Sequence, residues 1–152
     1  VVTSFFPGFM TDWQGPWAIL MTQAKGESTI HETVYESRFG YVDELKKMGA
    51  NLELFVPKME NPEQTYNFNY TTESRNNKQG LKISGKTDLH SAVLNVSDLR
   101  AGATLVMASL IASGQSVVYG AEYLERGYEA FDERLRSLGA VIEVLEEEEV
   151  EV

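Results

Sequence analysis

The stretch MTDWQGP, residues 10–16, recurs in similar form as VSDLRAG, residues 96–102. In both places an acid follows a hydroxyl residue and opens an apolar run. When Asp12 is aligned with Asp98, the following residues keep the same offset of 86 positions, so that Met21 corresponds to Met107. Similarity at a fixed period indicates a repeated structural unit. The sequence therefore predicts a fold that contains two copies of one unit.

The similarity continues to the end of each copy. LKKMGANLEL, residues 45–54, matches LRSLGAVIEV, residues 135–144, with a glycine at the same place in both. A chain of 152 residues with 43% hydrophobic content is long enough for one compact core. We therefore expect a single domain made of two repeat units, about 1–85 and 86–145.

Each unit shows the same order of helix and strand patterns. The first apolar run predicts a helix that ends near Gly26 or Gly114, and a β-branched segment follows at 28–34 or 115–119. The second helix has apolar residues spaced i, i+4, i+7: Tyr41, Leu45 and Met48, or Phe131, Leu135 and Leu138. An alternating strand ends each unit, with Leu52, Leu54 and Val56 inward, or Val141 and Val144.

A strand is predicted to enter each unit: 93–96, which has a clear pattern, and 3–6, which has a weaker one. The resulting β-α-β-α-β order predicts an α/β (α+β) fold with parallel crossovers and helices packed on a sheet. Between the units, residues 57–80 form a polar insertion in which Tyr66, Phe68 and Tyr70 alternate. This insertion is either a hairpin or a mobile loop.

The composition excludes several classes of function. The chain has no cysteine and two isolated histidines, so neither a disulfide nor a metal site is expected, and no cofactor motif is present. The formal net charge is -10 and no basic stripe occurs, which argues against a nucleic-acid partner. Five of the acids lie in the tail at 146–152, which we expect to be a solvated end and not a site.

The longest apolar stretch, residues 104–112, is far shorter than the roughly 20 residues of a membrane span. No signal peptide precedes it, so we expect a cytoplasmic protein without a membrane partner. The chain begins Val-Val-Thr with no initiating methionine, and we expect it to be a piece of something longer.

Asp12 and Asp98 each have two interpretations. A carboxylate at a helix start accepts hydrogen bonds from the free amides there, which is worth about 1 kcal/mol. Thr11 and Ser97 are themselves good caps, however, and would leave the carboxylates free to face a ligand. Arg100 lies two residues after Asp98, either within reach of the same pocket or as an ordinary surface arginine.

Two arginines, Arg38 and Arg126, are predicted near the start of the second helix of each unit. The helix dipole is positive there and disfavours a cation by about 0.3 to 1 kcal/mol. One explanation is an anion held by both the helix terminus and the guanidinium. The other is a local salt bridge, to Glu36 for Arg38 and to Glu122 or Glu129 for Arg126.

Four motifs carry a specific resemblance to a known family. They are PGFMTDWQ (7–14), STIHETVYESRFGYVDELKKMGA (28–50), VSDLRAGATLVMASL (96–110) and ERGYEAFDERLRSLGA (125–140). Together, and in this order, they resemble the C-terminal part of the UDP-N-acetylglucosamine 1-carboxyvinyltransferases, the bacterial enolpyruvyl transferases that begin peptidoglycan synthesis. The resemblance covers nearly the whole chain apart from the insertion and the acidic tail.

The resemblance implies two βαβαββ units, part of an inside-out α/β barrel in a two-domain enzyme. It also implies transfer of enolpyruvyl from phosphoenolpyruvate to the 3-hydroxyl of UDP-N-acetylglucosamine, through a tetrahedral adduct that loses phosphate. The family's base matches Asp12, and a backbone contact with the sugar nucleotide matches Val34. The groups around phosphate and carboxylate match Arg38, Arg100 and Arg126, with Asp98 beside them.

The chain departs from the family pattern at a few positions. Ser37 replaces the usual asparagine, Glu125 replaces an aspartate before Arg126, and the insertion is longer than the family's hairpin. The resemblance also implies a missing N-terminal part that carries a loop cysteine and a lysine–asparagine pair, so this chain alone is expected to be inactive. Two alternatives stay open: the sister transferase that acts on shikimate 3-phosphate, and a non-catalytic binding module that keeps the fold.

Overall fold

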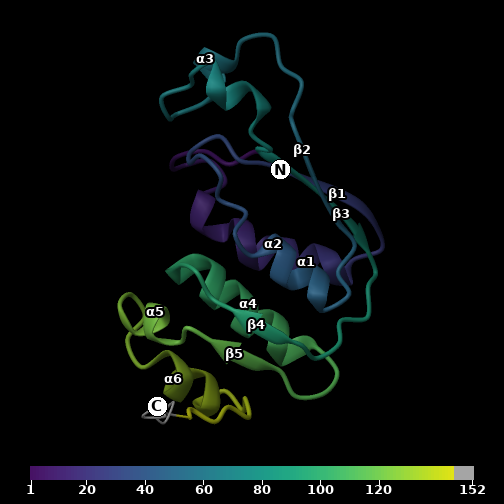
Figure 1. Ribbon diagram of the computed structural model, residues 1–152, viewed down its shortest axis with the longest axis vertical. Coiled ribbons are helices and arrows are strands. Elements are labelled where there is room, and N and C mark those ends of the chain that lie inside the picture. Colours follow the sequence, from purple (N-terminus) through teal and green to yellow (C-terminus); the bar gives the residue numbers. More distant parts are fainter. Residues whose placement is uncertain (146–152) are drawn as a thin grey trace, which may run out of the picture.

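The computed structural model describes residues 1–145, and the predicted acidic tail at 146–152 lies outside them. Helices and strands alternate along the chain, and the two units lie one above the other in the view of Figure 1. The elements in order are η1 (Thr11–Trp13), α1 (Gln14–Gln23), β1 (Gly26–His31), α2 (Val42–Lys47), β2 (Leu52–Phe55), α3 (Pro62–Thr65), η2 (Glu73–Asn76), β3 (Gly80–Gly85), β4 (Val93–Asn95), α4 (Leu99–Ile111), β5 (Val117–Tyr119), α5 (Glu122–Glu125) and α6 (Phe131–Ser137).

The first unit contains a three-stranded sheet in the order β1-β3-β2. The central strand β3 is antiparallel to both neighbours, so β1 and β2 run parallel to each other and are connected through α2. The weak entry strand is reduced to isolated bridges, of which Val2 makes a parallel one with His31. Apart from this entry strand, the predicted order is present in the unit as α1-β1-α2-β2, and β3 follows as an additional strand.

The second unit repeats only the beginning of this pattern. Strands β4 and β5 pair in parallel and are connected through α4, as predicted, and α6 follows. The predicted strand with Val141 and Val144 is wrong: the structure has no strand between α6 and residue 145, and Val141 is 99% exposed. In the first unit β3 pairs with the corresponding strand, β2, and residues 1–145 contain no counterpart of β3 after α6.

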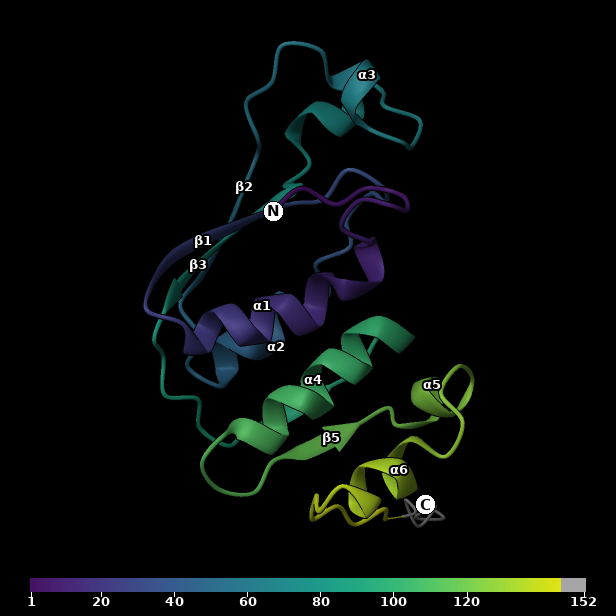
Figure 2. The same ribbon diagram turned by 180° about the vertical axis from the view of Figure 1, so that it is seen from behind.

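The core lies between the sheet of the first unit and helices α1, α2 and α4, which Figure 2 shows from behind. Helices α1 and α4 approach each other closely at Gly15, where an added Cβ would lie 2.0 Å from the Thr104 hydroxyl oxygen. A glycine at this position therefore allows the two repeat units to pack through their first helices. The fully buried side chains of the core include Ile30, Leu45, Met48, Leu81, Ile83, Leu94 and Leu105.

The second helices of the two units differ in burial. In α2 the predicted face is confirmed, because Tyr41, Leu45 and Met48 are each at most 3% exposed. Helix α6 forms where predicted, yet none of its residues is buried, and Leu138 just after it is 84% exposed. The apolar spacing therefore predicted both helices, but among the described residues only α2 contributes to the buried core, where it packs against α4 and β4.

The insertion at 57–80 is irregular, as predicted, and contains the short helices α3 and η2. The hairpin interpretation is wrong, because the three aromatic residues gather into a cluster and do not alternate along a strand. Tyr66 stacks on Tyr70 with ring centroids 5.2 Å apart, and Phe68 lies 4.7 Å from Tyr66. Side-chain packing within the loop thus replaces the ladder of a hairpin.

Candidate functional site

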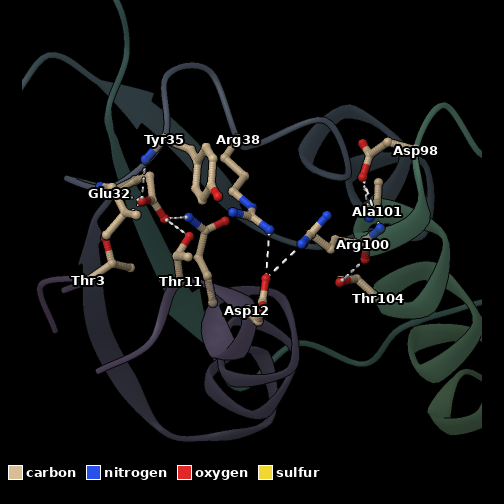
Figure 3. A network of polar contacts seen from close by, with 12 residues as sticks. Thr3, Thr11, Asp12, Glu32, Tyr35, Arg38, Asp98, Arg100, Ala101 and Thr104 are labelled. Atoms are coloured by element: carbon tan, nitrogen blue, oxygen red, sulfur yellow. Dashed lines mark hydrogen bonds and ion pairs between the residues drawn. The ribbon is translucent and has the colours of Figure 1, made fainter. Parts of the chain in front are cut away.

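A pocket of about 140 Å³ lies where the starts of α1 and α4 meet, between the two units. Residues from both units line it, so neither unit has this site alone. Figure 3 shows the four charged residues that line it, Asp12, Arg38, Asp98 and Arg100. The polar and aromatic residues that line the pocket are Thr11, Asp12, Gln14, Arg38, Tyr41, Asp98, Arg100, Thr104, Tyr128 and Phe131.

Asp12 joins the two units by accepting hydrogen bonds from two arginines. Its Oδ1 atom lies 2.7 Å from Arg38 Nη2 and 2.7 Å from Arg100 Nε (Figure 3). The Asp12 side chain is 59% exposed, while that of Arg38 is 14% exposed. Within residues 1–145, Asp12 Oδ2 has no hydrogen-bond partner, and most N–H groups of both guanidiniums are also left without one. The cluster can therefore accept from a hydroxyl and donate to an anion.

Asp12 does not cap its helix, but the reason differs from the one that we expected. Thr11 does not cap the helix: its hydroxyl donates to Glu32 Oε2 at 2.8 Å, and no side chain caps η1 or α1. The prediction that Thr11 takes over the capping is therefore wrong. Its consequence nevertheless holds, because Asp12 binds arginines and does not cap a helix.

The two arginines determine the electrostatics of Asp12. The hydrogen bond from Arg100 lowers the pKa of Asp12, partial burial opposes this, and the positive charges of Arg100 and Arg38 lower it further. The same hydrogen bond raises the pKa of Arg100. A carboxylate held in this way stays ionised and accepts hydrogen bonds well, but it is a weak proton acceptor while both arginines stay bound to it.

Asp98 corresponds to Asp12 in the repeat and does the work of a cap. Its Oδ1 atom accepts from the backbone N–H of Arg100 at 2.9 Å and of Ala101 at 3.0 Å, at the start of α4 (Figure 3). The prediction that Ser97 would take over this capping is wrong. Asp98 also lines the pocket, so the structure brings it together with Asp12, Arg38 and Arg100.

Arg38 lies in the loop before α2, which begins at Val42, and not in the helix itself. The predicted partner Glu36 is wrong, because Glu36 accepts hydrogen bonds from Ser74 and Asn77 of the insertion. The Arg38 guanidinium lies over the Tyr35 ring, 4.4 Å from its centroid, a cation–π contact that directs it toward Asp12.

The loop turns sharply at Ser37, which has a φ of 55°. This left-handed conformation is uncommon for a serine, and asparagine adopts it several-fold more readily. The asparagine usual in the resembling family therefore has a physical explanation at this position.

Two predicted site residues lie away from the pocket. Val34 is buried, and its backbone N–H donates to Glu32 Oε1 at 2.8 Å. Arg126 ends the short helix α5, with its guanidinium 5.5 Å from the Tyr123 ring centroid. Among the described residues it forms no salt bridge, so the predicted pairing with Glu122 or Glu129 is wrong, and Glu129 binds Arg134 instead. The substrate roles of Val34 and Arg126 stay predictions.

Sequence reasoning missed several polar residues at the site. Gln14 is 2% exposed and accepts a hydrogen bond from the Tyr41 hydroxyl at 3.1 Å. Burial raises the pKa of Tyr41, so its hydroxyl stays a donor near neutral pH. Glu32 is fully buried below the pocket. One signal was visible for Glu32, namely an acid between Ile30 and Val34 in a segment predicted to be a strand.

The described part of the chain lacks both a metal-binding cluster and a membrane-spanning helix. Among residues 1–145, no group of three or more acidic or histidine side chains is arranged to hold a metal ion. None of the helices within residues 1–145 is both long enough and apolar enough to cross a bilayer.

Comparisons with known proteins agree with the motifs. Residues 1–135 match the family model described as EPSP synthase (3-phosphoshikimate 1-carboxyvinyltransferase). Proteins named UDP-N-acetylglucosamine 1-carboxyvinyltransferase are 42% identical in Protochlamydia amoebophila, over 96% of this chain, and 43% identical in Chlamydia abortus, over 94%. These alignments cover 30% and 31% of the relatives, so the chain spans about a third of their length.

A solved structure gives the same result for the fold. The crystal structure of the enolpyruvyl transferase NikO from Streptomyces tendae matches with a TM-score of 0.74 and 28% sequence identity. The match covers 94% of this chain and 28% of that one. The resemblance drawn from the four motifs is thereby confirmed, and so is the α/β fold of the enolpyruvyl transferases.

Proposed function

The chain belongs to the EPSP synthase family, and on that premise we propose that it is part of a transferase that moves enolpyruvyl from phosphoenolpyruvate to the 3-hydroxyl of UDP-N-acetylglucosamine. The names of the relatives that are 42% and 43% identical support this choice of acceptor over shikimate 3-phosphate. The same names support a role in the first committed step of peptidoglycan synthesis. Because the chain spans about a third of those relatives, we expect turnover to need the rest of the enzyme.

One observation carries the proposal: an aspartate between two arginines in a pocket formed by both units. Phosphoenolpyruvate carries a phosphate and a carboxylate, and guanidinium groups match both in charge and in fork geometry. Arg38 and Arg100 can therefore hold this substrate. Asp12 Oδ2, which has no partner among the described residues, can accept the hydrogen bond of the sugar 3-hydroxyl.

The shared arginines couple the binding of one substrate to the basicity of Asp12. While Arg38 and Arg100 bind Asp12, they lower its pKa and make it a weak base. When the anion takes these guanidiniums, their charge is neutralised and the pKa of Asp12 rises. Asp12 then accepts the hydroxyl proton as the sugar oxygen bonds to C2 of phosphoenolpyruvate, while C3 takes up a proton to give the tetrahedral adduct. Loss of phosphate from C2 and of a proton from C3 restores the double bond and completes the transfer.

Titration calorimetry of the chain with UDP-N-acetylglucosamine, in the presence of phosphoenolpyruvate, tests this function. We expect saturable binding that weakens about tenfold in Asp12→Asn, which keeps the shape of the side chain and removes its charge. Glu44→Gln is the matched control, because Glu44 is a carboxylate paired with Lys47 outside the pocket, and binding should be unchanged. Binding of shikimate 3-phosphate but not of the sugar nucleotide would support the sister transferase instead.

A further inference from the structure

Glu32 is a fully buried carboxylate, and it directly follows strand β1 of the first repeat unit. It forms no salt bridge within residues 1–145. Burying an acid without a cation costs free energy unless hydrogen bonds replace its water shell. The groups that donate hydrogen bonds to Glu32 therefore show which parts of the chain it holds together.

Five donors surround the two oxygen atoms of Glu32. Oε1 accepts from the Thr3 hydroxyl at 2.9 Å and from the backbone N–H groups of Val34 at 2.8 Å and Tyr35 at 3.0 Å. Oε2 accepts from the Thr11 hydroxyl at 2.8 Å and from the Gln14 side-chain amide. Since a carboxylate offers acceptors only, it satisfies this set of donors fully.

These donors come from three separate segments of the chain. Two of these segments carry Asp12 and Arg38. Thr11 precedes Asp12 at the start of α1, and Tyr35 lies under the Arg38 guanidinium in the loop before α2. Figure 3 shows the Glu32 carboxylate between these two segments. One buried side chain thus bonds to the side chains of Thr11 and Gln14 beside Asp12 and to the backbone of the loop that carries Arg38.

A second buried side chain supports the same loop from the other side. Gln79 is 1% exposed; its amide nitrogen donates to the Tyr35 carbonyl at 2.9 Å, and its carbonyl oxygen accepts from the Ser37 N–H at 2.9 Å. The loop that carries Arg38 is therefore held by side chains and has little freedom to move.

We propose that Glu32 is a positioning residue, which holds the Asp12 segment and the Arg38 loop at the separation that lets the two side chains bond. Glu32 is not among the residues that line the pocket. It acts on the site only through its hydrogen bonds with Thr11, Gln14, Val34 and Tyr35. Its importance for substrate binding rests on the proposed function. The effect of Glu32 on the Asp12–Arg38 pair is independent of the proposed function.

Carboxyl-carbon NMR titration of Asp12 in the Glu32→Gln chain tests the proposal. A glutamine amide has nearly the same shape but turns N–H donors toward groups that are themselves donors. We expect the Asp12–Arg38 bond to loosen and the pKa of Asp12 to rise. Loss of the negative charge at Glu32 alone would lower that pKa, so the two effects have opposite signs. An unchanged or lowered pKa in the folded variant would overturn the proposal.

Thr11→Val supplies a milder variant in case Glu32→Gln does not fold. It removes one donor to Glu32 without changing any charge, and we expect a smaller rise in the pKa of Asp12. Thr22→Val is the matched control, because it removes a fully buried hydroxyl from α1 that donates to the Ile19 carbonyl and does not contact Glu32. If the pKa of Asp12 rose equally in Thr22→Val, general destabilisation of α1 would explain the rise in Thr11→Val. That result would contradict the proposal.

The affinity for the sugar nucleotide separates this proposal from the proposed function. If the unmodified chain binds UDP-N-acetylglucosamine, Glu32→Gln should weaken that binding about tenfold. If the unmodified chain binds neither substrate, the proposed function fails, while the pKa of Asp12 in the two variants still decides whether Glu32 positions the pair.

Discussion

Asp12 and Asp98 stand at the same place in the two repeat units, and the structure uses them differently. Asp98 caps α4 through two backbone N–H groups, whereas Asp12 leaves its helix uncapped and binds two arginines. One of these arginines belongs to each unit, so the second unit contributes a charge to the site of the first. The repeat therefore keeps the place of this side chain in the fold but not its role.

The units also differ in how they bury their second helix. Helix α2 packs into the core against α4 and β4 of the second unit, while α6 has no buried residue. Arg38 lies in a loop that is anchored in the core by the buried residues Val34 and Phe39. Tyr128 and Phe131, from the less buried end of the second unit, also line the pocket.

The largest expected difference between the units is in stability. Leu45→Ala, in α2, removes a fully buried side chain and should lower the free energy of unfolding by about 2 to 5 kcal/mol. Leu135→Ala, at the corresponding place in α6, should cost less than about 1 kcal/mol because its surroundings are open. Urea denaturation of both variants measures this, and equal losses would show that α6 is packed as α2 is.

A smaller effect should separate the two aspartates. Asp98→Ala removes a helix cap and should cost about 1 kcal/mol of unfolding free energy. Asp98→Asn, which keeps a capping oxygen, should recover most of this loss. Asp12→Ala removes no cap and should cost less than Asp98→Ala. Thermal unfolding followed by circular dichroism gives the three values, and a greater loss in Asp12→Ala would contradict the assignment of roles.

The pH dependence of stability should show the same difference. Since the pKa of Asp12 is lowered in the folded protein, its ion pairs stabilise the fold above its unfolded value of 3.8. That contribution is lost as the pH falls through the lower folded value. The unfolding free energies of the unmodified chain and Asp12→Asn should therefore differ at neutral pH and converge below pH 3.8. Because Asp12 is 59% exposed, the difference should stay below about 1 kcal/mol.

The smallest effect concerns the backbone beside Arg38. Ser37→Asn should raise the free energy of unfolding by about 0.5 kcal/mol, since asparagine adopts the left-handed conformation more readily than serine. Ala130→Asn, at the residue of positive φ before α6, is the matched change in the second unit and should stabilise by a similar amount. Urea denaturation again gives both values. A loss of stability at either position would contradict the backbone account.

Local patterns in the sequence predicted the elements but not their partners. The apolar spacing of Tyr41, Leu45 and Met48 was enough to predict α2, and the repeat showed that α6 follows the same pattern. The alternating pattern at Val141 and Val144 did not correctly predict a strand, because a strand forms only where a neighbouring strand pairs with it. The hydrogen bond between Asp12 and Arg100 joins residues 88 positions apart, which only the packing of α1 against α4 brings together.

The resemblance identified Asp12, Arg38, Asp98 and Arg100, which do meet at one pocket. It gave no indication of Glu32, whose five hydrogen bonds depend on three segments that fold together. Its position in the predicted strand 28–34 was a weak signal, because charged residues are mostly at the surface and the sequence did not show that this one is buried. Buried polar residues that support a site are therefore the part that requires the structure.

The most direct test of the site is the pKa of Asp12, measured by carboxyl-carbon NMR with and without phosphoenolpyruvate. If Arg38 and Arg100 bind the substrate's anionic groups, they release Asp12, and its pKa should rise when phosphoenolpyruvate is added. Glu44, which is paired with Lys47 outside the pocket, should titrate identically in both samples. A pKa of Asp12 that does not change at saturating phosphoenolpyruvate would contradict the assignment of these arginines to the substrate.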